Sequence, residues 1–519
     1  MTSHRVMGRL GAATAAVILL LGGAACGAPS NGPGSAKADQ TLKWALPAPP
    51  NSLDITKAIN ATSYTVQSAG LETLVHPEAG QIKPWLAKSW TSPDPLTYVF
   101  ELRDDVTFWN GAPMTADDVA FSIERNISPS SLISYDFTAV SSATATGAHE
   151  VTVKLKHPDP LFLQVAIGTD ALVVQKSYVQ AAGDQIGTPD KLNMGTGPLE
   201  FKSFSKTSGV TLDRYDKYWG DKPTFAGVQF TTISDPETMR IALTQGQVDG
   251  SFDGTAAHSD QYKSNKTNVS LAPGKGYLYM SMDVRQAPFN DVHVRKAIAL
   301  ALDKQAITKA TAGNAAQPAD ALMTRPQFET MFGQDGVDFT SQVPSTTTNL
   351  DAAKAELAQS KTPKGISTSV RFNADGRLAF QVIQQQLAPL GIVLNGQQVD
   401  DNQFYSEIGK ISDPQGLRII LSGAASTDPW ESLRSLLGDA DTAGYSSDVT
   451  KTNLDILAST ADPAQRKSAV VAISKDIADQ APFIPLYTTK QMLVLGKEWA
   501  YDNFTPRGSG WILKLHPAS

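Results

Sequence analysis

The chain is poor in cysteine, because Cys26 is the single one among 519 residues. A lone cysteine cannot form a disulfide within the chain, and it leaves no second thiol for a metal site built on cysteine pairs. A folded body without disulfides must owe its stability to packing. Cys26 lies at the end of an apolar run near the start of the chain, and this position suggests a covalent use instead.

Several signatures of enzymes and of nucleic-acid-binding proteins are also missing. The sequence has no phosphate loop, no His-Glu-x-x-His and no Gly-x-Ser-x-Gly. Its seven histidines are scattered without the spacing of metal ligands. The net charge is −7 and no basic stripe stands out. We therefore expect a protein that is not an enzyme, with no cofactor, no metal and no nucleic-acid partner.

A targeting segment covers residues 1–25. Two arginines precede an apolar stretch, and Gly22-Gly23-Ala24-Ala25 leads directly into Cys26, which is the layout of a secretory signal peptide. Small residues before a cysteine resemble the lipobox of bacterial lipoproteins, in which that cysteine is diacylated and becomes the first mature residue. Gly23 stands where the box usually has a leucine-like residue. The alternative is therefore an ordinary signal, cleaved near Ala24-Ala25, that leaves a free thiol.

Residues 26–40 are rich in Gly, Ser, Pro and Ala and predict a flexible tether. The remaining body is too long for a single core, so two or three subdomains are expected. No later stretch approaches 18 consecutive apolar residues, so we expect no second membrane span.

Local patterns predict two strands and a helix in the first part of the body. Alternating side chains predict a strand over 97–102 and a second strand over 106–109, closed by the turn signal Asn110-Gly111. Thr115, followed three residues later by Asp118, is typical of a capping box. Apolar residues at four-residue steps behind it predict an amphipathic helix.

Seven stretches along the body together resemble the signature of one family. They lie at 83–90 (Lys-Pro-Trp-Leu-Ala-Lys-Ser-Trp), 108–111 (Phe-Trp-Asn-Gly), 114–119, 195–198 (Gly-Thr-Gly-Pro), 215–220 (Tyr-Asp-Lys-Tyr-Trp-Gly), 288–298 and 482–487. In this order and spacing they resemble the extracytoplasmic solute-binding proteins of family 5, the dipeptide, oligopeptide and nickel binders of ABC importers.

The resemblance implies an α/β fold of two lobes, the class II periplasmic-binding-protein fold, with an extra α/β domain on the first lobe. Local patterns agree, with helices predicted over 351–358 and 378–388 and a strand over 391–394. By motif position, lobe I would take 41–74, 192–274 and 490–519, the extra domain 75–191, and lobe II 275–489. A hinge is expected near 273–276 and again near 487–491.

In this family a segment soon after the Ser-Leu-Asp start lines the ligand cleft. Here that start is Ser52-Leu53-Asp54, so the lining would cover 59–64. Asn60, Thr62 and Tyr64 could hydrogen-bond to a ligand or stack on it. The alternative is that this segment is only an exposed loop.

A second lining loop carries the ammonium-binding acid of the peptide binders, in a Gly-Trp-x-x-Asp-x-x-Asp-Pro pattern. This chain has a shorter loop over 421–430. Counting from its two ends puts the ammonium-binding position at Thr427 or at Ala425. Asp428 could take that role with one residue of slip, and Trp430 could replace the missing tryptophan. Asp401 and Asn402 complete the candidate ligand-binding set.

A buried ammonium without a counter-charge is strongly disfavoured. If Asp428 only forms the turn before its proline, a free peptide N-terminus is a poor ligand. We therefore expect specificity to depart from plain dipeptides, and a modified peptide or an oligosaccharide is an alternative ligand.

The function we expect is that of a monomeric receptor, anchored through Cys26 on the outer face of the cytoplasmic membrane. It would capture a peptide or peptide-like solute and deliver it to ABC permease subunits. A regulatory lipoprotein that kept the scaffold but lost transport is the rival interpretation, and an exported hydrolase is a distant third.

Overall fold

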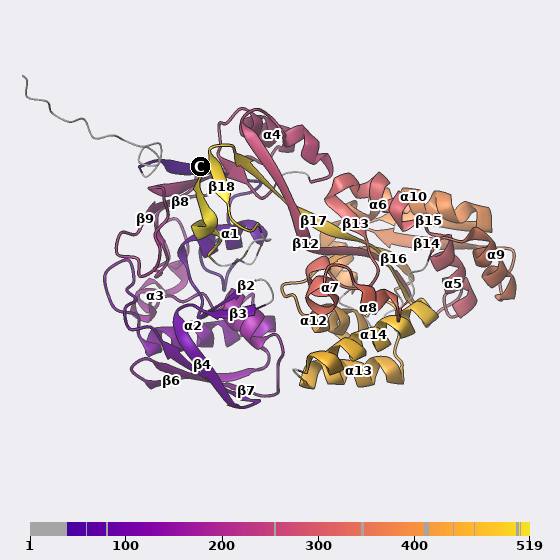
Figure 1. The fold of residues 1–519 in the computed structure, drawn as a ribbon, viewed down its shortest axis with the longest axis horizontal. Helices are drawn as coiled ribbons and strands as arrows, with labels where there is room; N and C mark the ends of the chain where they lie inside the picture. The colour runs from indigo at the N-terminus through magenta and orange to yellow at the C-terminus, as the bar shows by residue number, and fades with distance from the viewer. Residues whose placement is uncertain are drawn as a thin grey trace, which may run out of the picture.

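A computed structural model describes residues 39–518 of the protein, apart from short gaps. The gaps are 59, 79–80, 254–255, 344–346, 409–414, 440, 461, 505–507 and 509. Two lobes lie side by side and are connected by two long strands, β12 (Thr267–Met282) and β17 (Phe483–Gly496) (Figure 1). The expected two-lobed α/β fold is thereby confirmed, while the boundaries predicted for its parts stay a prediction.

Within the described residues, eleven strands form one mixed sheet that runs through both lobes. Besides β12 and β17 these are β1 (Thr41–Leu46), β8 (Leu199–Ser205), β9 (Gly209–Arg214), β10 (Gly227–Thr232), β11 (Gly250–Ser251), β13 (Ala316–Pro318), β14 (Ile366–Phe372), β15 (Ile392–Gln398) and β16 (Leu417–Gly423). The strand order is β15-β14-β16-β12-β17-β11-β1-β10-β9-β8, and β13 pairs with β17. The two connecting strands therefore lie at the centre of the sheet, each partly in lobe I and partly in lobe II.

Lobe I is the part that holds β1, and its core contains several large aromatic side chains. Trp44 on β1 is fully buried and packs against Phe252 and Trp511, with ring centroids 4.8 and 4.9 Å apart. The other elements of lobe I are α1 (Ala61–Gly70), β2 (Val75–Glu78), β3 (Gln81–Pro84), β4 (Ala87–Asp94), β5 (Thr97–Leu102), α2 (Ala116–Ile127), β6 (Val140–Gly147), β7 (Glu150–Leu155), α3 (Lys176–Ala182), α4 (Pro236–Thr244), β18 (Trp499–Tyr501) and β19 (Leu515–Pro517). Strands β4-β5-β7-β6 form a separate antiparallel sheet, on which α2 packs.

Lobe II has helices on both faces of its half of the sheet. Successive side chains of a strand point to opposite faces, and β12 divides its residues accordingly. Tyr277 and Tyr279 belong to one apolar cluster, while Leu278 and Met280 belong to another. The helices are α5 (Val292–Ala301), α6 (Lys304–Ala312), α7 (Arg325–Phe332), α8 (Val337–Thr340), α9 (Leu350–Gln359), α10 (Arg377–Leu387), α11 (Asp401–Ile408), α12 (Pro429–Arg434), α13 (Asp448–Ser459) and α14 (Pro463–Gln480).

Most of the local predictions are confirmed, and one is wrong. The strand over 97–102 is β5, and Thr115 and Asp118 form the expected capping box of α2. The helices over 351–358 and 378–388 are α9 and α10, and the strand over 391–394 begins β15. Residues 106–109 do not form a full strand, because Thr107 makes only an isolated antiparallel bridge with Pro113. The chain then turns at Asn110-Gly111, as predicted, and the amide of Gly111 donates to the carbonyl of Phe108 at 2.8 Å.

Three of the signature motifs meet at one buried carboxylate, that of Glu72. It accepts hydrogen bonds from Trp85 Nε1 (2.9 Å), Tyr218 Oη (2.7 Å), Thr196 Oγ1 (2.8 Å) and Trp219 Nε1 (3.2 Å). Burial raises the pKa of Glu72, and these four hydrogen bonds oppose that shift. The motif tryptophans are therefore used to build lobe I.

Candidate functional site

A cavity of about 520 Å³ lies between the two lobes. One wall comes from lobe I and the other from α7 and the loop after β16, while β12 lies between them. Pockets of roughly 300–1,000 Å³ are typical of small-molecule sites. Its lining residues are His76, Pro77, Glu78, Gln164, Gly168, Thr169, Ala272, Pro273, Lys275, Pro326, Glu329, Thr330, Gly333, Gln334, Ala425, Thr427, Tyr501, Phe504, Gly508, Trp511 and Lys514.

The connecting strands are irregular where they pass the cavity. The register of β12 against β17 shifts between Pro273 and Tyr277, so the chain bulges there. Thr489 on β17 holds the bulge, since the amide of Gly276 donates to its Oγ1 at 3.1 Å and that hydroxyl donates to the Gly276 carbonyl at 3.2 Å. A Cβ on Gly276 would lie 2.7 Å from the same oxygen, so this close approach requires glycine. The bulge places Lys275 on the cavity wall.

A π-helix, Phe162–Asp170, forms part of the lobe I wall. Its wide turn is visible in the hydrogen bond from the amide of Ala171 to the carbonyl of Ala166 at 2.8 Å, five residues back. The Thr169 hydroxyl likewise donates to the carbonyl of Gln164 at 2.9 Å. Helices of this kind are rare and are frequent at functional sites. This one brings Gln164 and Thr169 to the cavity.

The same π-helix region reaches across to lobe II. Gln164 Nε2 donates to Thr427 Oγ1 at 2.9 Å. Leu161 and Val165 are 8% and 2% exposed and belong to an apolar cluster otherwise formed by lobe II residues. The two lobes are therefore in direct contact at this edge of the cavity.

Lys275 is half-buried, and its position gives the cavity a cationic group. Its Nζ donates to the carbonyl of Ala425 at 2.8 Å. Burial lowers the pKa of Lys275, while the negative charges of Glu431 and Asp170 oppose that shift. Glu431 itself accepts from the backbone amides of Ala425 and Ser426, at 2.7 and 2.8 Å, and so orders the loop that Lys275 contacts.

Charged groups on the lobe I wall are paired with one another. Glu78 is bonded to Lys83 and lies 3.3 Å from Lys514 Nζ. The hydrogen bond from Lys83 is the largest cause that lowers the pKa of Glu78 to about 2. Burial lowers the pKa of His76 to about 4. At neutral pH this wall therefore carries a neutral imidazole and the Glu78–Lys514 pair, while Lys83 binds Glu78 from outside the lining.

An acidic pair, Asp136 and Asp170, lies at the end of the π-helix. Burial raises the pKa of Asp136 to about 6, and burial together with Asp136 raises that of Asp170 well above its usual range. Two carboxylates that share a site cannot both ionise easily. The pair therefore retains a proton close to neutral pH.

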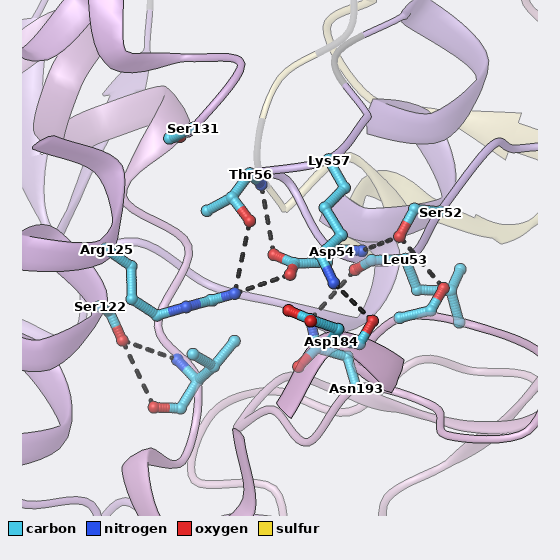
Figure 2. Close-up of polar contacts among 12 residues, drawn as sticks. Ser52, Leu53, Asp54, Thr56, Lys57, Ser122, Arg125, Ser131, Asp184 and Asn193 are labelled. Atoms are coloured by element: carbon cyan, nitrogen blue, oxygen red, sulfur yellow. Dashed lines mark hydrogen bonds and ion pairs between the residues drawn. The ribbon is translucent and has the colours of Figure 1, made fainter. Parts of the chain in front are cut away.

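The Ser52-Leu53-Asp54 start is fixed to lobe I by a buried ion pair (Figure 2). Arg125 Nη2 lies 2.6 Å from Asp54 Oδ2, and the Asp54 side chain is 1% exposed. The amide of Thr56 donates to Asp54 Oδ1 at 3.2 Å, and Asn193 Nδ2 donates to the carbonyl of Leu53 at 3.1 Å. These contacts position the chain just before α1.

The candidates of the first lining segment have different surroundings. Asn60 caps α1, because its side chain accepts from the amide of Ser63 at 2.8 Å, and Thr62 is buried on that helix. Tyr64 Oη donates to the carbonyl of Thr169 at 3.3 Å, which places it next to a residue of the cavity wall. Of the three, Tyr64 thus makes a contact with the cavity lining.

In the second lining loop the structure separates the candidates. Ala425 lines the cavity. Asp428 instead binds Arg466 Nη2 through both carboxylate oxygens, at 2.5 and 2.6 Å, and caps α12 by accepting from the amide of Trp430 at 2.9 Å. Trp430 is 8% exposed, with the guanidinium of Arg434 4.7 Å from its ring.

Three candidates cannot be placed. The side chains of Asp401 and Asn402, at the start of α11, lie outside the described part of the structure, as does Cys26. The structure also brings in Gln164, Lys275 and other cavity residues that sequence reasoning missed. The one available signal was that Lys275 stands between two glycines.

Two general features of the described residues bear on function. None of their helices has the length and apolar character needed to cross a membrane. In the same part of the chain, His, Cys, Asp and Glu side chains do not gather in threes as metal ligands would.

Comparisons with known proteins agree with one another. The model of the family described as bacterial extracellular solute-binding proteins, family 5 Middle, matches residues 81–444. The glutathione-binding protein GsiB of Shigella flexneri serotype 5b is 26% identical over 431 residues, 79% of this chain and 81% of that protein. The dipeptide-binding protein of Escherichia coli K12 is 27% identical over 387 residues, 68% and 70% of the two chains. The periplasmic binding protein DppA of Helicobacter pylori, solved with the peptide STSA, has the same fold, with 23% identity, a TM-score of 0.71, and coverage of 93% and 98%.

Proposed function

Because the chain belongs to family 5 of the bacterial extracellular solute-binding proteins, we propose that it captures a peptide or peptide-like solute for an ABC importer. The observation that carries this proposal is the cavity of about 520 Å³ lined from both lobes. A solute held there touches both lobes at once, so its binding favours the closed arrangement. The mechanism is hinge closure about β12 and β17 without covalent chemistry.

The class of solute follows from the relatives and from the cavity. The two curated relatives are named for binding glutathione and a dipeptide. The cavity offers apolar rings together with a few charged groups, as small-molecule sites usually do. Calorimetric titration with glutathione and with di- to pentapeptides tests the proposal. Heat of binding to at least one of them is expected, and the absence of binding heat for the whole set would exclude a peptide-like solute.

We further propose that a free ligand amine is not bound by Asp428. Both oxygens of Asp428 are already engaged by Arg466, and its helix cap uses a third contact. Withdrawing this acid would leave the buried guanidinium of Arg466 uncompensated. Each peptide that binds should therefore be compared with its N-acetylated form. Similar affinity of the two forms is expected, whereas a large loss on acetylation would show that an acid takes the amine.

Anchoring and delivery complete the proposal. A diacylated Cys26 would hold a monomeric receptor on the outer face of the cytoplasmic membrane, where ABC permease subunits receive the solute. Two acyl chains give stable attachment where one is marginal. Replacing Cys26 by Ala should release the protein from the membrane fraction, and a variant that still sediments with membranes would argue against the anchor alone.

A further inference from the structure

Lys275 has spare hydrogen-bonding capacity at the cavity wall. An ammonium group carries three N–H donors, and here one of them reaches the carbonyl of Ala425. Among the described residues, no carboxylate lies within 4 Å of its Nζ. The other lysine that lines the cavity differs in this respect, since Lys514 pairs with Glu78.

The acids that influence Lys275 are themselves occupied. The carboxylate of Glu431 accepts hydrogen bonds from the amides of Ala425 and Ser426, and Asp170 is paired with Asp136. Neither Glu431 nor Asp170 lines the cavity. A ligand anion that entered could therefore bind Lys275 without first displacing a protein carboxylate from it.

The position of Lys275 also suits recognition that is coupled to closure. It lies in the bulge of β12, and its one bond already reaches lobe II at Ala425. A charge-assisted hydrogen bond is about twice as strong as a neutral one. An anion bound here would add such a bond at the point about which the lobes move.

We propose that Lys275 binds a carboxylate of the solute and makes the site selective for peptide-like ligands that carry one near the hinge. This inference rests on the proposed peptide-binding function. The carboxylate can come from a peptide C-terminus or from an acidic side chain, and the chemistry at Lys275 is the same for both.

Three synthetic libraries of di- to pentapeptides test the inference. The first has free C-terminal carboxylates and no Asp or Glu, the second has the same sequences as C-terminal amides, and the third has amides that contain Glu. Purified protein is equilibrated with each library and the retained peptides are identified by mass spectrometry. The variants are Lys275→Met, which keeps most of the aliphatic stem, and Lys490→Met as the matched control. Lys490 pairs with Pro273 on the neighbouring strand but does not line the cavity.

The native protein and Lys490→Met should prefer a carboxylate-bearing library over the plain amides by at least roughly 30-fold. Lys275→Met should reduce this preference to less than about threefold. Retention of the first library assigns the carboxylate to the C-terminus, and retention of the third assigns it to a side chain. Equal retention of acids and amides by the native protein, or an unchanged preference in Lys275→Met, would overturn the inference while the peptide-binding function stands. A lowered melting temperature with an unchanged preference would mean that Lys275 is only structural. If no library is retained, the proposed function itself fails and the inference falls with it.

Discussion

Replacing Arg125 by Leu should destabilise lobe I more than replacing its partner, Asp54, by Asn. The carboxylate of Asp54 is 1% exposed, and its one cation lies 2.6 Å away. Without Arg125, the Asp54 carboxylate still accepts a hydrogen bond from the backbone amide of Thr56 but has no counter-charge. Removing one partner of a buried ion pair typically costs about 3–5 kcal/mol. We expect a loss of about 3 kcal/mol in the free energy of unfolding, because the Arg125 side chain is 17% exposed and some water already reaches the site.

The opposite replacement, Asp54→Asn, should cost less. It removes the buried charge and leaves Arg125, whose side chain can turn toward solvent. An amide keeps one acceptor for the amide of Thr56, so we expect a loss of about 1–2 kcal/mol. In the double variant the two losses should not add, since both remove the same interaction.

Urea unfolding followed by tryptophan fluorescence measures all three variants, because Trp44 and Trp511 report on the core of lobe I. Equal slopes against urea would show that the changes lie in stability and not in compactness of the unfolded chain. If Arg125→Leu lost less stability than Asp54→Asn, the reasoning from an uncompensated buried carboxylate would be refuted.

Other predictions concern the buried carboxylates and the hinge. Glu72→Gln should lower the free energy of unfolding by about 1–3 kcal/mol. The new side-chain NH2 group would lie opposite an indole N–H, and because both groups are donors no hydrogen bond can form between them. An unchanged urea midpoint would contradict this. The pKa of Asp136 is raised from 3.8 to about 6, so the folded state holds the extra proton and stability should fall as pH rises between about 4 and 6; Asp136→Asn should flatten that decline in melting temperature, and an equally steep curve would exclude Asp136 as its source. Gly276→Ala should lower the melting temperature, since its Cβ would lie 2.7 Å from Thr489 Oγ1; a gain in stability would argue against the close approach. Gln164→Ala removes a contact between the lobes and should enlarge the radius of gyration of the unliganded protein in solution scattering; an unchanged radius would show that the contact does not hold the lobes.

Local features of the fold could be predicted from the sequence because they depend on neighbouring residues. Thr115 and Asp118 are three residues apart and cap α2 as expected. The second strand is reduced to one bridge, from Thr107 to Pro113, and the predicted turn at Asn110-Gly111 follows directly. The pattern of apolar residues predicts that a segment is buried and extended, but the length of its pairing depends on the partner segment.

The site could be predicted only in part, because its residues come from distant segments. A shortened loop drew attention to Ala425, which lines the cavity, and to Asp428, whose partner Arg466 lies on a helix with no sequence motif to announce it. Lys275 looked like an ordinary charged residue until the bulge placed it at the cavity. The convergence of three motifs on Glu72 likewise requires the folded chain.

The order of the strands has a consequence for how the chain folds. β1, the first described strand, pairs with β10 and β11, and β11 in turn pairs with β17 near the end of the chain. Trp511 closes the same core over Trp44. Contacts between such distant segments slow folding, because a long loop must close before they form. Lobe II is nearly contiguous and can fold while the chain is still emerging. Lobe I must wait for the last segment, so a chain that ended between Gly496 and Trp511 would keep a folded lobe II and an open, aggregation-prone lobe I.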